Sequence, residues 1–371
     1  MTTQPLISPV APAPVLPSRF LAACQRRPVD ATPVWFMRQA GRYMPEYRAI
    51  REKYTLLEIC YHPELAAEVT LQPVRAFGVD AAILFADILL PAIPLGVGLE
   101  FVKGEGPLLH HPVRTLEDVQ NLRPVDAEAD LGYVLEAIRL LRQALDSVPL
   151  IGFCGAPFTV ASYLVEGGSS RDFLKTKTMM LSEPHTWHAL MNTLADVLRN
   201  YLLAQVRAGA QAVQVFDSWV GALSPQDYVD FVQPYSGRIL QAAQAAGVPV
   251  IHFGTGTTTL LPAMKAAGGT VFGLDWRLPL DEGWRLVGND VAVQGNLDPA
   301  VLFAPPAEIT RRVDDVLQRA AGRPGHIFNL GHGILQHTPV DAVRRVVDRV
   351  HEFSVQAGRL PDAHRACSGP A

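Results

Sequence analysis

PVWFMRQAGRYMPEYRAIR, residues 33–51, is the stretch that decides the predicted fold. Its first five residues are apolar or favour β structure, which predicts a buried strand over residues 33–37. The residues directly after this strand are Arg38, Gln39, Ala40, Gly41 and Arg42. A guanidinium group stays charged at any working pH and matches a carboxylate or phosphate with two parallel hydrogen bonds. An apolar strand that ends in such a cluster predicts a binding site for a polyanion.

These arginines have a second interpretation as surface residues. Glu46, Glu52 and Glu58 lie nearby in the sequence, and ion pairs with them on a solvated face would leave the cluster without a functional role. Arginine, tyrosine and glycine together at a strand end are common at binding sites, which favours the functional interpretation.

Composition and charge argue against several classes of protein. The chain has 371 residues, of which 49% are hydrophobic and 18% charged, enough for one large domain or two ordinary ones. A formal net charge of −4 argues against a nucleic-acid partner, which would require a broad basic surface. No apolar run is long enough to span a membrane, and the N-terminus lacks the pattern of a secretion signal. We therefore expect a cytoplasmic protein.

Short apolar segments alternate with longer helical ones along the chain. Strands are predicted at residues 33–37, 80–85, 148–154, 212–216, 249–253, 271–274, 291–294 and 326–330. Helices are predicted at residues 63–77, 129–145, 184–208, 225–246, 258–267, 306–321 and 339–356, and Pro73 is expected to kink or split the first of them. Eight strands with crossover helices predict a single (β/α)8 TIM barrel of the α/β class. The competing open, doubly wound sheet would carry a G-x-G-x-x-G motif after its first strand, and this chain has none there.

Several segments depart from this alternation. Residues 95–113, with a K-G-E-G turn, predict a β-hairpin inserted after the second strand, and residues 162–170, SYLVEGGSS, predict a mobile loop. Residues 1–17 are a Pro-rich leader and residues 358–371 have lost apolar periodicity. Both termini are expected to be disordered, which leaves residues 18–357 as the barrel domain.

Two of the predicted strand ends carry titratable side chains suited to chemistry. Asp87 lies between the apolar stretches LFA and ILLPAIP. Burial would favour its neutral form, whereas nearby arginines would favour its carboxylate, so the sequence leaves its ionisation state open. A carboxylate at this position can stabilise a developing cation or accept hydrogen bonds from several N–H donors. The alternative, non-functional interpretation is that Asp87 caps the next turn. His332, flanked by glycines in NLGHG, has an accessible ring, with loop packing as its alternative.

Tyr163 and Ser218 are further candidates with less specific surroundings. Tyr163 follows GAPFTVAS and could donate its phenol to an anion, although core packing is the alternative. Ser218, in VFDSWVG, has no G-x-S-x-G motif around it, so it is interpreted as a hydrogen-bonding or turn residue.

The sequence lacks the common cofactor and metal motifs. It has no P-loop, no H-E-x-x-H, no dinucleotide fingerprint and no clustered Cys and His ligands. We therefore expect no cofactor and no metal, and a reaction that uses the substrate's own electronics.

RQAGRYMPEYR, beginning at Arg38, resembles a motif of the uroporphyrinogen decarboxylase family. Further stretches resemble that family in the same order: FADIL from Phe85, GFCGAPFTVASYLVEGGSS from Gly152, FDSWVG from Phe216 and FNLGHGI from Phe328. The resemblance covers about residues 19–357. One departure is Gln336-His337, where many relatives have a proline, but it lies past His332 toward the next helix.

The resemblance implies a fold, an activity and a set of site residues. Members of the family are single (β/α)8 barrels, usually homodimers, that act in tetrapyrrole (haem) biosynthesis. They remove the acetate carboxyls of uroporphyrinogen III, a cyclic tetrapyrrole polycarboxylate, to give coproporphyrinogen III and CO2 without a cofactor. The family's binding loop falls on Arg38, Gln39, Ala40, Gly41 and Arg42, and its central catalytic aspartate on Asp87. Its tyrosine, serine and histidine fall on Tyr163, Ser218 and His332.

Two other functions remain open at this point. A corrinoid-dependent methyltransferase of the same superfamily would use zinc held by His and Cys, yet no Cys lies beside His252 or near His332. A tetrapyrrole-binding protein without turnover would keep the arginines but would not need Asp87.

Overall fold

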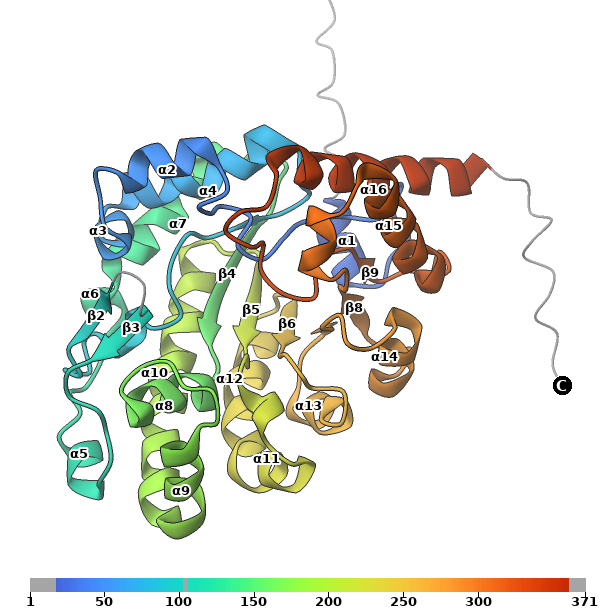
Figure 1. The fold of residues 1–371 in the computed structure, drawn as a ribbon. Coiled ribbons are helices and arrows are strands. Elements are labelled where there is room, and N and C mark those ends of the chain that lie inside the picture. Colours follow the sequence, from blue (N-terminus) through green and yellow to red (C-terminus); the bar gives the residue numbers. More distant parts are fainter. Residues whose placement is uncertain (1–17, 103–105, 360–371) are drawn as a thin grey trace, which may run out of the picture.

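The computed structural model describes residues 18–102 and 106–359 (Figure 1). The predictions of a disordered leader and tail fall on residues outside this range, except that the last helix ends at Arg359. Residues 103–105, in the predicted hairpin turn, also lie outside it.

Seven parallel strands form one curled sheet in the order β1-β4-β5-β6-β7-β8-β9 (Figure 1). Their bounds are Ala82–Ile83 (β1), Leu150–Gly155 (β4), Ala212–Phe216 (β5), Val250–Phe253 (β6), Val271–Gly273 (β7), Ala292–Gln294 (β8) and His326–Ile327 (β9). The register pairs Ile151 with Ala212 and Val213 with Val250. Because all seven strands are parallel, their carboxyl ends lie at one end of the sheet.

A second, smaller sheet lies between β1 and β4 in the chain. Its strands β2 (Leu99–Val102) and β3 (Gly106–Leu109) are antiparallel, with Leu99 opposite Leu109. Leu108 forms an isolated antiparallel bridge with Gly168, which attaches this sheet to the turn after helix α8 (Pro157–Glu166).

Helices surround the curled sheet (Figure 1). The α-helices are α1 Arg19–Cys24, α2 Pro45–Arg51, α3 Leu56–Tyr61, α4 Pro63–Phe77, α5 Leu116–Gln120, α6 Ala127–Asp130, α7 Gly132–Ala144, α8 Pro157–Glu166, α9 Leu174–Ser182, α10 Pro184–Ala208, α11 Pro225–Phe231, α12 Gln233–Ala245, α13 Leu261–Ala267, α14 Leu280–Val287, α15 Pro306–Ala320 and α16 Val340–Arg359. The 3-10 helices are η1 Leu90–Ala92, η2 Val220–Ala222 and η3 Pro299–Phe303. Among the described helices none has the length and apolar character needed to cross a membrane.

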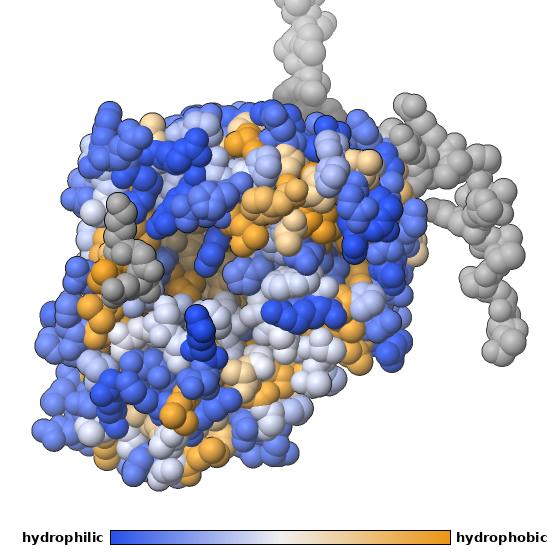
Figure 2. Space-filling view, in the orientation of Figure 1, coloured by the Kyte–Doolittle hydropathy of each residue, from blue (hydrophilic) through white to orange (hydrophobic). Residues whose placement is uncertain are grey.

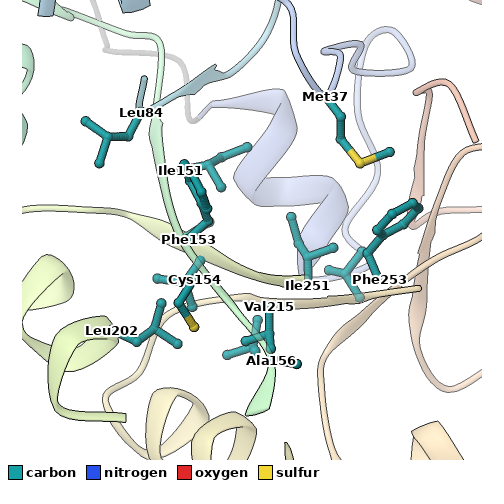
Figure 3. Packing of buried hydrophobic residues seen from close by; sticks show 14 of the residues in the cluster. Met37, Leu84, Ile151, Phe153, Cys154, Ala156, Leu202, Val215, Ile251 and Phe253 are labelled. Atoms are coloured by element: carbon teal, nitrogen blue, oxygen red, sulfur yellow. The ribbon is translucent and has the colours of Figure 1, made fainter. Parts of the chain in front are cut away.

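The core joins the sheet to its helices. All six residues of β4 are buried, as expected for a parallel strand covered on both faces. Figure 3 shows Cys154 on this strand close to Leu202 of α10 and Val215 of β5, with Ile251 of β6 near Val215. These four side chains are fully buried, so this packing fixes the strand ends that position the site.

The strand predicted at residues 33–37 is reduced to one isolated parallel bridge, between Val34 and Phe328. Side chains take two of the backbone donors that a regular ladder would use: Asp80 Oδ2 accepts from Val34 N at 2.7 Å, and Asn329 Oδ1 accepts from Met37 N at 3.3 Å. The segment still bonds on both sides, because Trp35 N donates to Phe328 O and Asp80 N donates to Val34 O. It therefore lies between β9 and the residues leading into β1.

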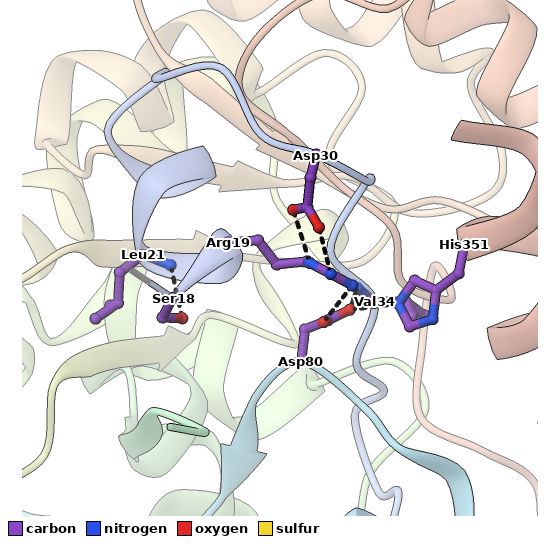
Figure 4. Close-up of polar contacts among 7 residues, drawn as sticks. All are labelled: Ser18, Arg19, Leu21, Asp30, Val34, Asp80 and His351. Atoms are coloured by element: carbon purple, nitrogen blue, oxygen red, sulfur yellow. Dashed lines mark hydrogen bonds and ion pairs between the residues drawn. The ribbon is translucent and has the colours of Figure 1, made fainter. Parts of the chain in front are cut away.

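Asp80 is the polar anchor of this junction (Figure 4). Its carboxylate accepts from Arg19 Nη1 at 3.2 Å and contacts His351 Nε2 at 2.8 Å, in addition to the bond from Val34. Asp30 holds the other side of the Arg19 guanidinium at 2.6 Å. Helices α1 and α16 are thus attached to the start of the segment that carries the arginine loop.

Other predicted elements agree with the structure or differ for identifiable reasons. The predictions for α4 and α10 are confirmed at both ends, and α4 runs through Pro73 without a break. The helix predicted at 225–246 is two helices that meet at Val232, because Pro234 in the first turn of α12 cannot continue a preceding helix. Helix α14 was not predicted, because a glycine interrupts its short apolar pattern at Gly283.

Candidate active site

The loop after residue 37 is held by a buried glutamine. The Gln39 side chain accepts from Phe36 N at 3.1 Å and donates to Ala81 O at 3.1 Å, and the Tyr43 hydroxyl donates to Gln39 O at 2.6 Å. Gln39 is fully buried. The loop is therefore fixed from inside the protein, while its flanking arginines stay exposed.

Arg38 occupies an unusual backbone conformation. Its φ is +58°, in the left-handed region that costs an ordinary residue about 1 kcal/mol or more. Its side chain runs over Gly333, where a Cβ would lie only 2.5 Å from Arg38 Cδ. A side chain at position 333 would therefore displace Arg38, whose Cβ, Cγ and Cδ atoms lie against the loop that carries His332.

The surface ion-pair interpretation of the arginines does not fit their contacts. Among the described residues, no ion pair joins this cluster to Glu46, Glu52 or Glu58. Arg48 Nη1 instead donates to Arg42 O at 3.0 Å and to Tyr43 O at 2.9 Å. Arg42 contacts Gln336 at 3.4 Å and lines a groove of about 1420 Å³.

The groove beside Arg42 is also visible on the molecular surface. It lies between α2, the β2–β3 sheet and the segment that leads into α16, and Figure 2 shows the face hollowed there, with apolar residues inside and hydrophilic residues around it. A large ligand with an apolar body and charged edges would find both kinds of contact in such a hollow.

Asp87 follows β1 and is half-buried. Its Oδ1 accepts a hydrogen bond from Leu89 N at 2.8 Å, so the predicted alternative of a turn cap describes one of its contacts. Burial raises the pKa of its carboxyl, whereas the Leu89 N–H and the Arg38 guanidinium oppose that rise. Asp87 is therefore a partly desolvated carboxyl with one fixed donor and a cation nearby.

Tyr163 lies on α8, so the mobile loop predicted at residues 162–170 is wrong for residues 162–166, which are helical. The helix runs from Pro157 to Glu166 and ends at Gly167, whose φ of +86° suits a helix C-cap. The Tyr163 ring packs edge-on against Trp219 at 6.1 Å between ring centroids. Burial and then the charge of Asp87 raise the pKa of the Tyr163 phenol, which therefore stays protonated and able to donate.

Ser218 and Trp219 follow β5 and are tied down from two directions. Thr255 Oγ1 donates to Ser218 O at 2.6 Å, and Trp219 N donates to Thr159 Oγ1 at 3.4 Å. Trp219 was missed as a site residue, and its place beside Ser218 in FDSWVG was the available signal.

His332 follows β9 and is neutral at ordinary pH. Gly333 N donates to His332 Nδ1 at 2.7 Å, which leaves the ring proton on Nε2. Burial, Arg38 and Arg277 lower the pKa of His332 to about 4. Trp276 lies edge-on to the imidazole at 6.5 Å between ring centroids. The His332 imidazole is therefore available as a neutral hydrogen-bond donor.

A second buried histidine provides a stability prediction. His326, in β9, contacts Gly295 O through Nε2 at 2.9 Å, and burial lowers its pKa to about 4. Between about pH 6.5 and 4 the unfolded chain binds a proton that the folded chain does not, so acid destabilises the fold. In the wild type this proton uptake should lower the free energy of unfolding by about 2 kcal/mol between pH 7 and pH 5. His326→Gln should abolish that part of the pH dependence.

Urea unfolding at the two pH values measures this difference. His185→Gln, at an exposed position of α10, is the matched control and should keep the wild-type pH dependence. An unchanged pH dependence in His326→Gln would show that His326 is not the group responsible.

The structure brings three of the predicted site residues within electrostatic reach of a fourth, Arg38. The Arg38 charge acts on the pKa of Asp87, Tyr163 and His332, which follow β1, β4 and β9 in the chain. Ser218 joins them through its neighbour Trp219, which contacts Tyr163. Arg42 lies farther along the loop, at the groove wall.

Known proteins resemble this chain over nearly its whole length. The uroporphyrinogen decarboxylase family pattern matches residues 16–353. A uroporphyrinogen decarboxylase from Sorangium cellulosum is 63% identical over 336 residues, which are 90% of this chain and 96% of that protein. The chain belongs to the uroporphyrinogen decarboxylase family. A member from a Roseiflexus species is 56% identical over 345 residues, 91% of this chain and 99% of that protein.

Solved structures of proteins that carry other names share the fold of this chain. A methyltransferase from Methanosarcina mazei aligns with a TM-score of 0.73 at 21% identity, covering 90% of this chain and 98% of that one. A putative vitamin-B12-independent methionine synthase from Listeria monocytogenes aligns with a TM-score of 0.57 at 13% identity, covering 88% and 98%. At these identities the likeness concerns the fold alone.

Proposed function

We propose that this chain decarboxylates the acetate side chains of uroporphyrinogen III to give coproporphyrinogen III and CO2, without a cofactor. The observation that carries the proposal is the Arg38 charge near the partly desolvated carboxyl of Asp87, in a member of the uroporphyrinogen decarboxylase family. A fixed cation attracts the substrate's carboxylates, and a carboxylate beside it can stabilise positive charge that develops during the reaction.

Substrate binding is assigned to the loop 38–42. Arg38 and Arg42 hold carboxylates, while Gln39 fixes the loop because its side chain is already bonded within the protein. Ala40 and Gly41 have small side chains or none, so the backbone can approach the ligand. A Cβ at Gly41 would also lie 3.2 Å from Arg38 O, within the loop itself. The pyrrole N–H groups converge on Asp87.

The chemical step uses the pyrrole ring as the electron sink. A proton adds to a ring carbon and makes an iminium-like cation; the bond between the acetate methylene and its carboxylate then breaks, and its electron pair neutralises the ring as CO2 leaves. A proton on the freed methylene carbon and loss of the ring proton complete the step, so each CO2 consumes one proton. The Asp87 carboxylate stabilises the cation, which exists only along the reaction path.

The remaining site residues orient the macrocycle. Tyr163 and His332 each present a neutral donor, because the phenol stays protonated and the imidazole keeps its proton on Nε2. Ser218 offers a hydroxyl in a loop fixed by Thr255. Neutral donors can bind the substrate's carboxylates without competing with the cation for Asp87.

The proposal extends to the architecture. Residues 33–37 would serve as the eighth wall segment of a (β/α)8 barrel, supported by their bonds to Phe328 and Asp80. β2 and β3 would form a hairpin inserted after the second strand. The net charge of −4 supports the absence of a nucleic-acid partner, and the family resemblance supports a cytoplasmic homodimer.

A product assay tests the proposed function. Purified protein is incubated with uroporphyrinogen III under reducing, oxygen-free conditions, and the products are oxidised and separated by carboxyl number. The proposal expects intermediates with progressively fewer carboxyls and coproporphyrin at the end. Recovery of unchanged uroporphyrin would favour a tetrapyrrole-binding protein without turnover.

Chelators distinguish the methyltransferase alternative, which the curated relatives do not favour. Within residues 18–102 and 106–359, no three His, Cys, Asp or Glu side chains are grouped to hold a metal ion. Extended dialysis against a zinc chelator should therefore leave the decarboxylation rate unchanged. A loss of activity that added zinc restores would contradict this prediction.

A further inference from the structure

Arg277 is held rigidly at the end of β7. Its backbone N donates to Asp275 Oδ1 at 2.9 Å and its Nη1 donates to Asp275 Oδ2 at 2.8 Å. The guanidinium carbon also lies 4.2 Å from the centroid of the Trp276 ring. The side chain is therefore restrained along one edge by a carboxylate and across one face by an aromatic ring.

This arrangement leaves the Arg277 charge available to a ligand. Asp275 is almost fully buried, whereas 51% of the Arg277 side chain is exposed. Asp275 also accepts a hydrogen bond from Gly256 N, so its negative charge is shared among several donors. A guanidinium has five N–H donors, and a group already fixed in place loses little side-chain entropy when it binds an anion.

Arg277 faces the same site as the residues assigned above. Trp276 contacts the His332 ring, and the Arg277 charge acts on the His332 imidazole. In the sheet order, β7 is four strands from β1, which leads to Asp87. The assigned residues follow segment 33–37, β1, β4, β5 and β9, so Arg277 places a cation in the part of the strand-end face that they leave uncovered.

We propose that Arg277 binds a propionate carboxylate of the macrocycle, across the site from Asp87, with Asp275 and Trp276 as positioning residues. The inference rests on the proposed function, because it takes the substrate to be a cyclic tetrapyrrole polycarboxylate. Acetates disappear one by one during the reaction, whereas propionates persist in every intermediate. A fixed cation far from the reacting group therefore assists each step only when it binds a propionate.

Arg277→Gln tests this assignment against Arg311→Gln. Arg311 is an exposed arginine of α15 that pairs with Glu308, so the control removes the same charge and also breaks an ion pair. We expect Arg277→Gln to raise KM about tenfold and leave kcat within about twofold, because a partly exposed charged hydrogen bond is lost from binding alone. Arg277→Lys keeps the positive charge and should recover part of the affinity. If the Gln variant folds poorly, the KM of Arg277→Lys is compared with that of the wild type instead, and an unchanged KM would overturn the proposal.

The substrate series identifies the bound group. The KM ratio between wild type and Arg277→Gln should be the same for uroporphyrinogen and for the intermediate that retains a single acetate. A ratio that falls to one with that intermediate would assign Arg277 to an acetate and overturn the proposal, as would an unchanged KM with both substrates.

A binding measurement separates this inference from the proposed function. Uroporphyrin, the oxidised and unreactive macrocycle, keeps all the carboxylates and can be followed by its own fluorescence. A wild-type protein that never releases CO2 would refute the decarboxylase assignment, whereas Arg277 would still be judged by its uroporphyrin Kd. We expect that Kd to rise about tenfold in Arg277→Gln and to stay at the wild-type value in Arg311→Gln; equal Kd values in both variants would overturn the role of Arg277.

Discussion

Replacing Asp87 with asparagine should lower kcat by about two orders of magnitude or more while KM changes by less than about fivefold. The carboxylate stabilises a charge that exists mainly in the transition state, so its loss is felt in the rate more than in binding. The amide is nearly isosteric and keeps an acceptor oxygen for the Leu89 N–H, so the turn after β1 should survive. Steady-state kinetics with uroporphyrinogen III measures both constants.

Asp126→Asn is the matched control for this substitution. Asp126 accepts from Glu128 N at 2.9 Å, two residues along the chain, as Asp87 does from Leu89 N, but it caps α6 on the exposed surface. The control should keep wild-type kinetics. A near-normal kcat in Asp87→Asn would refute the electrostatic role, and equal losses in kcat and affinity would limit Asp87 to gathering the pyrrole N–H groups.

Arg38→Ala should reduce kcat/KM roughly tenfold to hundredfold, and Arg42→Ala should reduce it by a smaller factor. A charged hydrogen bond to a carboxylate contributes about 1.5 to 3 kcal/mol, and Arg38 lies nearer to the assigned catalytic group than Arg42 does. Arg42 lines the groove wall, where solvent weakens the interaction. Initial rates at low substrate concentration measure the change.

Arg26→Ala separates loss of a site residue from backbone strain. Arg26 is also an exposed arginine with a left-handed backbone, at φ +54°, but its Nη1 donates to Asp290 O away from the site residues. Both alanine variants should show similar changes in unfolding free energy, and only Arg38→Ala should lose activity. Wild-type kcat/KM in Arg38→Ala would return the arginine cluster to the surface interpretation.

The sequence predicts helices and strands best where several signals from neighbouring residues point to the same element. Helix α10 has a proline in its first turn, a continuous apolar stripe and Gly209 after its end, and both predicted bounds are confirmed. The strand prediction for residues 33–37 is wrong for a reason that no local pattern contains. Two of the segment's backbone N–H groups donate to the side chains of Asp80 and Asn329, which are far away in the sequence. At Tyr163 the sequence favours a loop, because two glycines follow closely, yet the apolar spacing continues the helix α8 to Glu166.

The site residues likewise divide into those with a signal along the chain and those that only the fold brings to the site. Arg38 and Asp87 were found from a charged cluster and from a carboxylate in apolar company, both of which are visible along the chain. Arg277 gives no such signal, since one arginine in a turn is ordinary. Only the fold shows that Asp275 and Trp276 restrain it beside His332.

Release of CO2 from position-labelled substrate tests the central claim most directly. Uroporphyrinogen III labelled at the acetate carboxyl carbons is compared with the same compound labelled at the propionate carboxyl carbons, with Asp87→Asn assayed in parallel. Labelled CO2 is expected from the acetate-labelled substrate alone, at a rate reduced about a hundredfold or more in Asp87→Asn. Label released from the propionates, or no label released by the wild-type protein, would contradict it.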